Sequence, residues 1–164
     1  MRRNDKQITD PDILTGLLLQ SPIGHIAMAE NNQPYCIPVN FAYYNKKIYI
    51  HCATEGKKLN IINTNTMVSF QTEMFTSFTE GKTPCSSGMK YTSVNCSGKA
   101  SIIDAFEEKN SILEIISRKY IKGSSFNFTK KQVLATTCIC INIDAISGKS
   151  SGYTIPELLK KLNL

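Results

Sequence analysis

The hydrophobic residues near the start of the chain recur at helical spacing. Asp10 is a favourable N-cap, and Pro11 suits the first position of a helix because its missing N–H would be unpaired there in any case. The apolar positions that follow recur at intervals of three or four residues, and they are Ile13, Leu14, Leu17 and Leu18. The pattern predicts that the fold opens with a helix.

Strand-like alternation replaces helical spacing in the next part of the chain. Residues 23–29, 35–44 and 47–53 have the pattern of strands, and the turn-forming sequences ENNQP and NKK separate them. These three segments predict an antiparallel meander. Residues 54–65 predict a short helix with Thr54 as its cap.

The middle of the chain combines two further strands with a polar segment. Residues 67–75 alternate between two faces, which predicts a strand. Residues 75–89 lose this periodicity and are rich in Gly, Pro, Ser and Thr, so we expect a long loop there. Loops of this length in a compact domain are usually functional or disordered. Residues 91–103 return to the strand pattern.

Two helices and one long strand are predicted for the last third. Residues 104–120 predict a helix that opens with a capping box from Asp104 to Glu107. Its expected buried face consists of Ile112, Ile115, Ile116 and Tyr120. After the polar linker KGSSFNFTKK, residues 133–147 predict a long strand, and the final TIPELLKKLNL predicts a short helix with its own capping box, T-I-P-E.

This order of elements predicts an α+β fold built on an antiparallel sheet or barrel with flanking helices, because strands follow one another without alternating βαβ units. The length of 164 residues is that of one domain, so we expect a single domain over residues 1–164. Neither G-x-G-x-x-G after a strand nor G-x-x-x-x-G-K-[ST] occurs in the sequence, which argues against a dinucleotide fold and a P-loop.

Composition and charge indicate what kind of ligand the protein binds and in which compartment it is expected. The formal net charge is +6, but the basic residues are scattered as pairs, which favours a small anionic ligand over nucleic acid. The contents of 41% apolar and 20% charged residues are those of a soluble chain, and no membrane segment is expected. The start MRRNDKQITD has no apolar h-region, so we expect a cytoplasmic protein with reduced cysteines. Because they lie two positions apart in an apolar run, we expect Cys138 and Cys140 to be small core residues on one face of a strand.

The sequence IYIHCATEGKKLNII, residues 48–62, marks a change from strand to helix. Free amide groups and the positive end of the helix dipole form an anion site at such a start, and Gly56 allows close approach to the backbone. Lys57 and Lys58 add full charges, so the corner has the chemistry of a phosphate site. Taken by itself, G-K-K is more often a solvated helix start, and a strand histidine such as His51 is more often structural.

The proline-containing strand PYCIPVNFAYY, the corner H-C-A-x-x-G-K-K and the segment GMKYTSV follow one another along the chain. Together they resemble the nitroimidazole-resistance branch of the pyridoxamine 5'-phosphate oxidase-like flavoproteins, and the resemblance extends over nearly the whole chain. It implies an FMN-binding split β-barrel, a homodimer, and FMN bound in clefts at the dimer interface.

The resemblance also implies roles for individual residues. Lys57 and Lys58 match the basic pair that holds the flavin phosphate, and Ala53 lies in the same cofactor-binding corner. His51 matches a position close to the flavin ring and the substrate pocket. The other matched cofactor-binding residues line the ring or lie near it, and they are Pro38, Val39, Asn40, Phe41, Ala42, Gln71, Tyr91 and Ser93. Ordinary sheet packing is the alternative for Gln71 and Tyr91.

These matches imply an FMN-dependent oxidoreductase that acts on a small molecule, with nitroimidazoles as the family's substrate class and His51 as the catalytic donor of a proton or hydrogen bond. The alternatives are a flavin carrier or sensor without turnover, a pyridoxamine phosphate oxidase-like enzyme, and a haem-binding split barrel with His25 or His51 as axial ligand. The related oxidases use an arginine and a histidine near the C-terminus, and the ending AISGKSSGYTIPELLKKLNL has neither.

Overall fold

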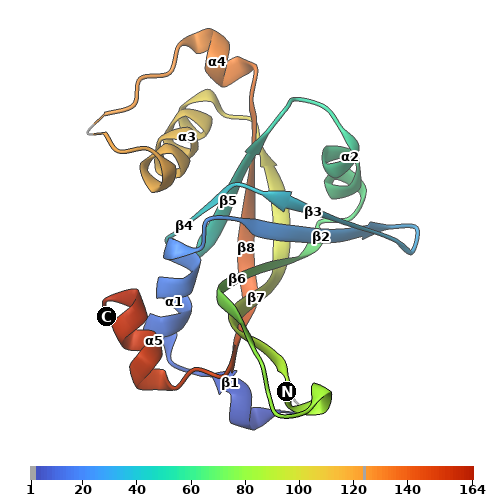
Figure 1. Ribbon diagram of the computed structural model, residues 1–164. Coiled ribbons are helices and arrows are strands. Elements are labelled where there is room, and N and C mark those ends of the chain that lie inside the picture. The colour runs from blue at the N-terminus through green and yellow to red at the C-terminus, as the bar shows by residue number, and fades with distance from the viewer. Residues whose placement is uncertain (1–2, 124) are drawn as a thin grey trace.

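The computed structural model describes residues 3–123 and 125–164. Within them, one antiparallel sheet has the strand order β3-β2-β6-β7-β8-β5-β4, and the short β1 pairs with β8 (Figure 1). The strands are β1 (Gln7–Ile8), β2 (Gly24–Glu30), β3 (Gln33–Val39), β4 (Phe41–Tyr44), β5 (Lys47–Cys52), β6 (Met67–Thr79), β7 (Gly88–Ile103) and β8 (Thr137–Ser151). The α-helices are α1 (Pro11–Gln20), α2 (Lys57–Thr64), α3 (Phe106–Tyr120), α4 (Lys130–Leu134) and α5 (Ile155–Leu162), and 3-10 turns cover Asn4–Lys6 and Pro84–Ser86.

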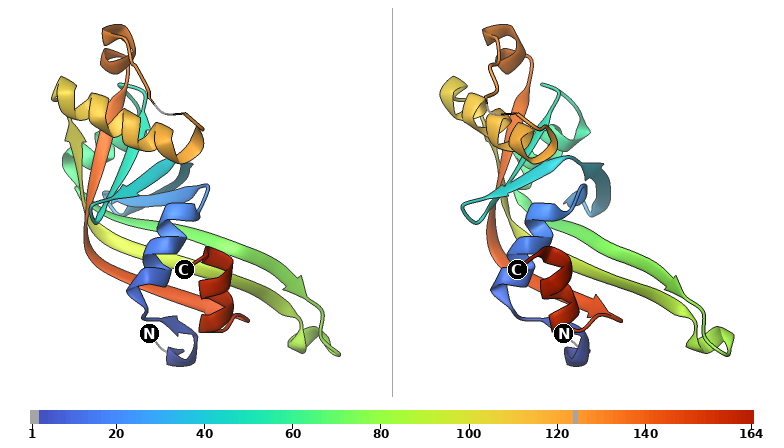
Figure 2. Two further views of the ribbon diagram at one scale, coloured as in Figure 1. Left: turned by 90° about the vertical axis from the view of Figure 1, so that its left-hand side faces the viewer. Right: turned by 60° about the vertical axis from the view of Figure 1, so that its left-hand side comes forward.

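The sheet curves into a barrel that stays open between its two edge strands. β3 and β4 lie at opposite ends of the strand order, yet they are consecutive in the chain and meet at Asn40. Their inward side chains share one core with the central strands, and the rings of Phe41 and Phe70 pack edge-on with centroids 4.7 Å apart. Figure 2 shows the curvature of β6, β7 and β8. The predicted α+β split barrel is confirmed.

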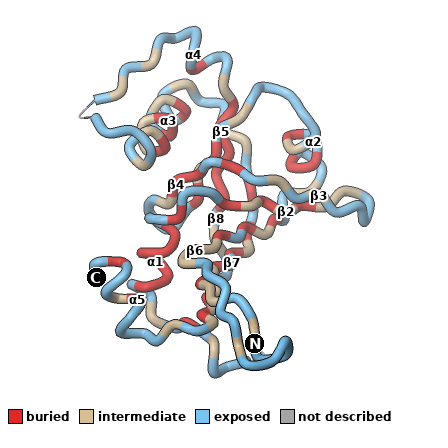
Figure 3. Tube along the Cα trace, in the orientation of Figure 1, coloured by how far each residue is buried: buried red, intermediate tan, exposed pale blue. Residues whose placement is uncertain are grey.

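The strands bury side chains on both faces where helices cover them. Ile48 and Ile50 of β5 point into the barrel and are fully buried. Tyr49 points the other way, into a smaller core under α3 that also contains Cys138. The buried part of the chain follows the strands and the inner sides of α1 and α3 (Figure 3). Cys138 and Cys140 are both buried, as the alternation predicts.

The predicted terminal helices are confirmed. The carboxylate of Asp10 accepts hydrogen bonds from the amides of Asp12 and Ile13 at the start of α1, and α5 begins with the predicted capping box from Thr154 to Glu157. α1 and α5 lie side by side at one end of the barrel (Figure 1). No helix among residues 3–123 and 125–164 is both long and apolar enough to cross a membrane.

Two predicted segments are divided differently in the structure. The predicted strand 35–44 is two strands, because the chain turns at Asn40 and passes from one end of the strand order to the other. The polar linker before residue 133 contains the start of the unpredicted α4, which extends to Leu134, so β8 begins later than predicted. A helix of five residues is too short for its apolar spacing to be recognised.

Two predicted N-caps are wrong. α2 begins after Gly56 instead of Thr54, because the chain enters the helix through Gly56 at φ +136° and ψ 166°, a conformation open essentially to glycine alone. α3 begins after Ala105 instead of Asp104, since Ala105 is still extended and no side chain caps this helix.

The predicted loop over residues 75–89 is largely a paired extension of two strands. β6 continues to Thr79 and β7 begins at Gly88, and these two residues are partners in the ladder. The register shifts between Met74 and Ser77, where Phe75 has φ +54°. The resulting arm projects from the barrel (Figure 2). Most of its side chains are exposed on both faces, so no apolar alternation marks the arm in the sequence.

Candidate functional site

β5 and α2 are joined by an exposed turn that contains Ala53 and Gly56. The backbone of Gly56 has φ +136° and ψ 166°, a conformation that side chains strongly disfavour, and a Cβ at this position would meet no atom within 4 Å. The carbonyl oxygen of Gly56 accepts hydrogen bonds from the amides of Leu59 and Asn60. No side chain caps α2, so the amides of Lys57 and Lys58 remain for solvent or a ligand.

The two lysines that follow Gly56 have different neighbours. Lys57 Nζ lies 4.7 Å from the centroid of the Tyr35 ring on β3, in a cation–π contact. Lys58 lies beside the end of β5, where its charge acts on His51 and Cys52. We call residues 51–58 the basic corner. It is the predicted anion site, and it lies where β5, α2 and the edge of β3 meet.

Two side chains of the basic corner, at the end of β5, have shifted pKa values. Partial desolvation by the surrounding protein lowers the pKa of His51, and the charge of Lys58 lowers it further, so the imidazole is neutral at neutral pH. Burial raises the pKa of Cys52, with Lys58 opposing it, and this residue is therefore a neutral thiol. His51 can donate a hydrogen bond at neutral pH, and Cys52 carries no thiolate for nucleophilic chemistry.

β3 presents an open backbone edge beside this corner. It pairs with β2, and within residues 3–123 and 125–164 no other strand pairs with it. Pro34 and Pro38 lie in it, as expected of an edge strand because proline cannot donate to a ladder. Pro38 and Asn40 are exposed, whereas the side chain of Val39 is buried.

The next two predicted site residues, Phe41 and Ala42, lie in β4. Phe41 is fully buried in the barrel core, and its backbone N–H and C=O both bond to the hydroxyl of Tyr120, at 2.9 and 3.0 Å. These backbone groups of Phe41 are therefore already paired within the chain. The side chain of Ala42 lines a cavity of about 630 Å³ between β4 and α3.

The strand register places two predicted residues in one row across the outer face of the sheet. Pro38 of β3 is the partner of His25 on β2, and His25 is also the partner of Gln71 on β6. The row continues through Asn95 to Ser147. His25, one of the two histidines named as possible haem ligands, lies in this row between Pro38 and Gln71.

Gln71 shares a cavity with the two remaining predicted residues. Tyr91 and Ser93 of β7 line a hollow of about 460 Å³ together with Gln71 and with residues of β8. Lys149 of β8 is one of these, and its Nζ lies 5.4 Å from the centroid of the Tyr91 ring. We call this hollow the sheet-face cavity. Its lining is polar, with amide, hydroxyl and ammonium groups that suit a polar or anionic ligand.

His51 lines a third hollow, of about 250 Å³, between β5, α3 and α4, together with Phe128 and Gln132. This volume is below the range of roughly 300–1,000 Å³ that is usual for small-molecule sites. His51 therefore belongs to the basic corner and also lines a small, partly apolar recess. Phe128 and Gln132 were not predicted, because they belong to the polar linker and to α4.

Most of the predicted side chains thus belong to the basic corner or the sheet-face cavity, and β3 has contacts with both, whereas Phe41 lies in the barrel core and Ala42 lines the cavity under α3. Tyr35 of β3 contacts Lys57 in the corner, and Pro38 of β3 lies in the same row as Gln71 in the cavity. The structure does not place the two groups in one hollow. Tyr35 was missed because its cation–π contact depends on how α2 folds back over β3.

Comparison with known proteins supports a common fold and family. The family described as pyridoxamine 5'-phosphate oxidase matches residues 10–150 of this chain. Among solved structures, a protein from Bacteroides thetaiotaomicron described as a candidate 5-nitroimidazole antibiotic resistance protein is 27% identical, with a TM-score of 0.78. The comparison covers 88% of this chain and 86% of that one. No curated protein matches the sequence.

Two more distant structures share the fold. An FAD and haem binding protein from Mycobacterium smegmatis is 21% identical, with a TM-score of 0.82 over 95% of this chain and 80% of that one. A flavocytochrome from Azotobacter vinelandii is 17% identical, with a TM-score of 0.83 over 93% and 72%. The match over residues 10–150, on a split barrel with the basic corner at the edge of β3, shows that this chain belongs to the pyridoxamine 5'-phosphate oxidase family.

Proposed function

We propose that this protein binds FMN at the basic corner and along the edge of β3, and that it passes electrons from the reduced flavin to a small nitro compound of the nitroimidazole class. The observation that carries the proposal is the start of α2. Gly56 leaves the backbone open, the first-turn amides are uncapped, and Lys57 and Lys58 follow at once. A phosphate is an anion that such a helix start can bind through its free amides, its positive dipole end and the two ammonium groups.

Each part of the site has a separate task. FMN supplies the redox chemistry when it is bound, and the protein supplies binding and orientation. Lys57 and Lys58 would hold the phosphate, next to Ala53. The edge of β3 would place the backbone groups of Val39 and Asn40 against the polar edge of the ring. This assignment is supported by the absence of any strand partner on that edge within the described residues.

His51 is the proposed catalytic residue. Conversion of a nitro group to a nitroso group consumes two electrons and two protons and releases water. The lowered pKa of His51 makes the neutral imidazole the dominant form at neutral pH. It would therefore orient the nitro oxygen by donating a hydrogen bond from a ring N–H.

We further infer that the flavin site is completed by a second copy of the chain. Gln71, Tyr91 and Ser93 line the sheet-face cavity, and Lys57 and Lys58 do not. In a homodimer, the sheet-face cavity of one protomer would face the flavin held by the basic corner of its partner. The relatives that bind flavin by name support a flavin as the ligand, and the phosphate chemistry of the corner supports FMN.

The first experiment compares FMN with riboflavin, which lacks the phosphate. Binding to the purified protein is followed by flavin fluorescence and by the visible spectrum. Lys57→Ala and Lys58→Ala should each weaken FMN binding about tenfold or more, because a charge-assisted hydrogen bond contributes roughly 1.5–3 kcal/mol. Riboflavin binding should stay unchanged. Lys131→Ala, an exposed lysine on α4, is the matched control.

Equal affinity for FMN and riboflavin would show that the corner holds no phosphate. A haem spectrum in place of a flavin spectrum would replace FMN by haem as the ligand. Turnover is tested separately by photoreducing the bound flavin and adding a 5-nitroimidazole. If the bound flavin is reoxidised no faster than free reduced FMN, the protein is a flavin carrier and the oxidoreductase proposal is wrong.

A further inference from the structure

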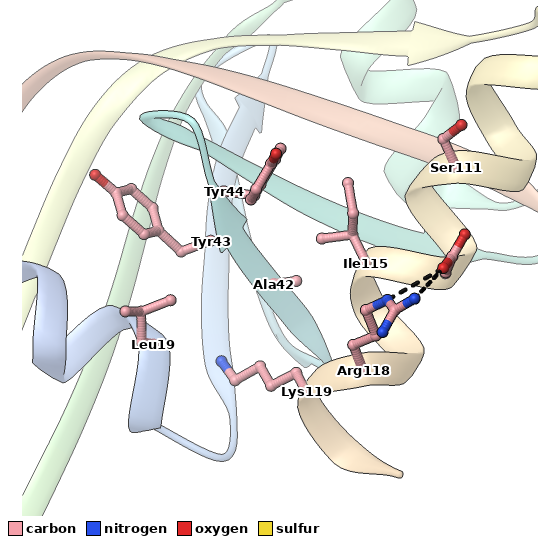
Figure 4. A pocket seen from close by; sticks show the side chains of 9 residues that line it. Leu19, Ala42, Tyr43, Tyr44, Ser111, Ile115, Arg118 and Lys119 are labelled. Carbon is pink, nitrogen blue, oxygen red and sulfur yellow. Dashed lines mark hydrogen bonds and ion pairs between the residues drawn. The ribbon is translucent and has the colours of Figure 1, made fainter. Parts of the chain in front are cut away.

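A cavity of about 630 Å³ lies between β4 and α3, apart from the basic corner and the sheet-face cavity (Figure 4). Apolar and aromatic side chains form most of its walls, and they are Leu19, Ala42, Tyr43, Tyr44 and Ile115. Its volume falls within the range of roughly 300–1,000 Å³ that is usual for small-molecule sites. Aromatic and aliphatic walls of this kind suit a flat, apolar ring.

Lys119 brings an amine to the end of this cavity. Its Nζ lies 3.3 Å from the centroid of the Phe41 ring and donates a hydrogen bond to the carbonyl oxygen of Leu18 at 3.2 Å. In the described part of the chain, that carbonyl is its one hydrogen-bond acceptor, although an ammonium group has three donors. Burial lowers the pKa of Lys119 to about 7, and an anion beside it would favour the charged form.

The other charges in the lining cancel. Arg118 and Glu114 form an ion pair on α3, one turn apart, and Figure 4 draws the bonds of the labelled Arg118 as dashed lines. Lys119 is therefore the remaining amine among the lining residues, and a bound anion would hold it in the charged form. One positive charge at the end of an apolar, aromatic cavity matches a ligand that carries one negative charge on an aromatic ring.

We propose that the cavity between β4 and α3 binds a small aromatic carboxylate, with the carboxylate on Lys119 and the ring between β4 and α3. The proposal does not depend on flavin binding, because the cavity includes neither lysine of the basic corner. Lys119 also has a possible structural role, because its hydrogen bond to Leu18 caps the C-terminal end of α1. The experiment must distinguish this role from ligand binding.

Calorimetric titration with benzoate and with its neutral analogue benzamide tests the proposal. Benzoate should bind at least about tenfold more tightly than benzamide, because benzamide lacks the charge that pairs with Lys119. Lys119→Met keeps the length of the side chain and should remove this preference, leaving benzamide binding unchanged. Lys131→Met, on exposed α4, should leave both titrations as they are.

Amide NMR shifts of the unmodified protein supply a test that does not depend on any variant. Benzoate should shift resonances of residues 42–44 and 111–119. Shifts confined to residues 51–58 would place benzoate at the basic corner and would overturn this proposal without touching the flavin proposal. Absence of benzoate binding at millimolar concentration, or equal binding of benzoate and benzamide, would also overturn it.

Discussion

The hydroxyl of Tyr120 accepts a hydrogen bond from the backbone N–H of Phe41 at 2.9 Å and donates one to the carbonyl oxygen of the same residue at 3.0 Å. Phe41 begins β4, an edge strand that pairs with β5. A side chain from α3 thus takes the place of a missing neighbour strand at this point. It ties α3 to the strand that follows the turn at Asn40.

Tyr120→Phe should therefore destabilise the fold. The substitution keeps the ring but removes both hydrogen bonds, and the expected loss is about 1–2 kcal/mol in the free energy of unfolding, measured with urea. Tyr44→Phe is the matched control on the exposed side of β4, and its effect should stay within about 0.5 kcal/mol. Equal effects of the two variants would show that the Tyr120 hydroxyl adds nothing to stability.

Lys58→Gln should raise the pKa of His51. Loss of the lysine charge removes the second cause of the lowered pKa, while desolvation, the larger cause, remains. The imidazole pKa should therefore rise but stay below its ordinary value of about 6.5. Titration of the ring protons by NMR measures this, with Lys131→Gln as the control. An unchanged pKa would mean that Lys58 does not act on His51.

Gly56→Ala should affect both stability and flavin binding. At φ +136° and ψ 166° a side chain is strained by about 1–3 kcal/mol, although there is open space for the methyl group. Relief of that strain would alter the start of α2, so FMN affinity should fall as well. Gly88→Ala is the control, since a Cβ there also meets nothing and its φ is not positive. Unfolding in urea and FMN titration compare the two, and indistinguishable variants would contradict the prediction.

Lys119→Met should change how stability depends on pH. Burial lowers the pKa of Lys119 to about 7 from an ordinary 10.5. Between these values the unfolded chain holds a proton that the folded chain releases, so the contribution of Lys119 to stability rises with pH. Methionine does not titrate, so the stability of Lys119→Met relative to the unmodified protein should fall as pH rises from 7 to 9.5. Urea unfolding at both pH values measures the two stabilities, and a difference that stays constant with pH would refute the prediction.

Several elements were predictable because their causes lie within a few residues. Asp10 bonds to amides two and three positions later, so its role as a cap follows from adjacent sequence alone. The alternation that buries Ile48 and Ile50 on one face of β5 is equally local. The arm of β6 and β7 was missed for the opposite reason, since exposed strands carry no apolar pattern and are held by their partners.

The sequence by itself determined the α+β class, most of the strands and the order H-C-A-x-x-G-K-K, which brings Lys57 and Lys58 to a helix start. Tertiary structure decided what these residues meet. The contact of Lys57 with Tyr35, and the bonds between Tyr120 and Phe41, which are 79 positions apart, depend on the strand order and on how the helices fold back. No local pattern specifies these contacts, because strand pairing and helix packing depend on how the apolar side chains of the whole chain are buried together.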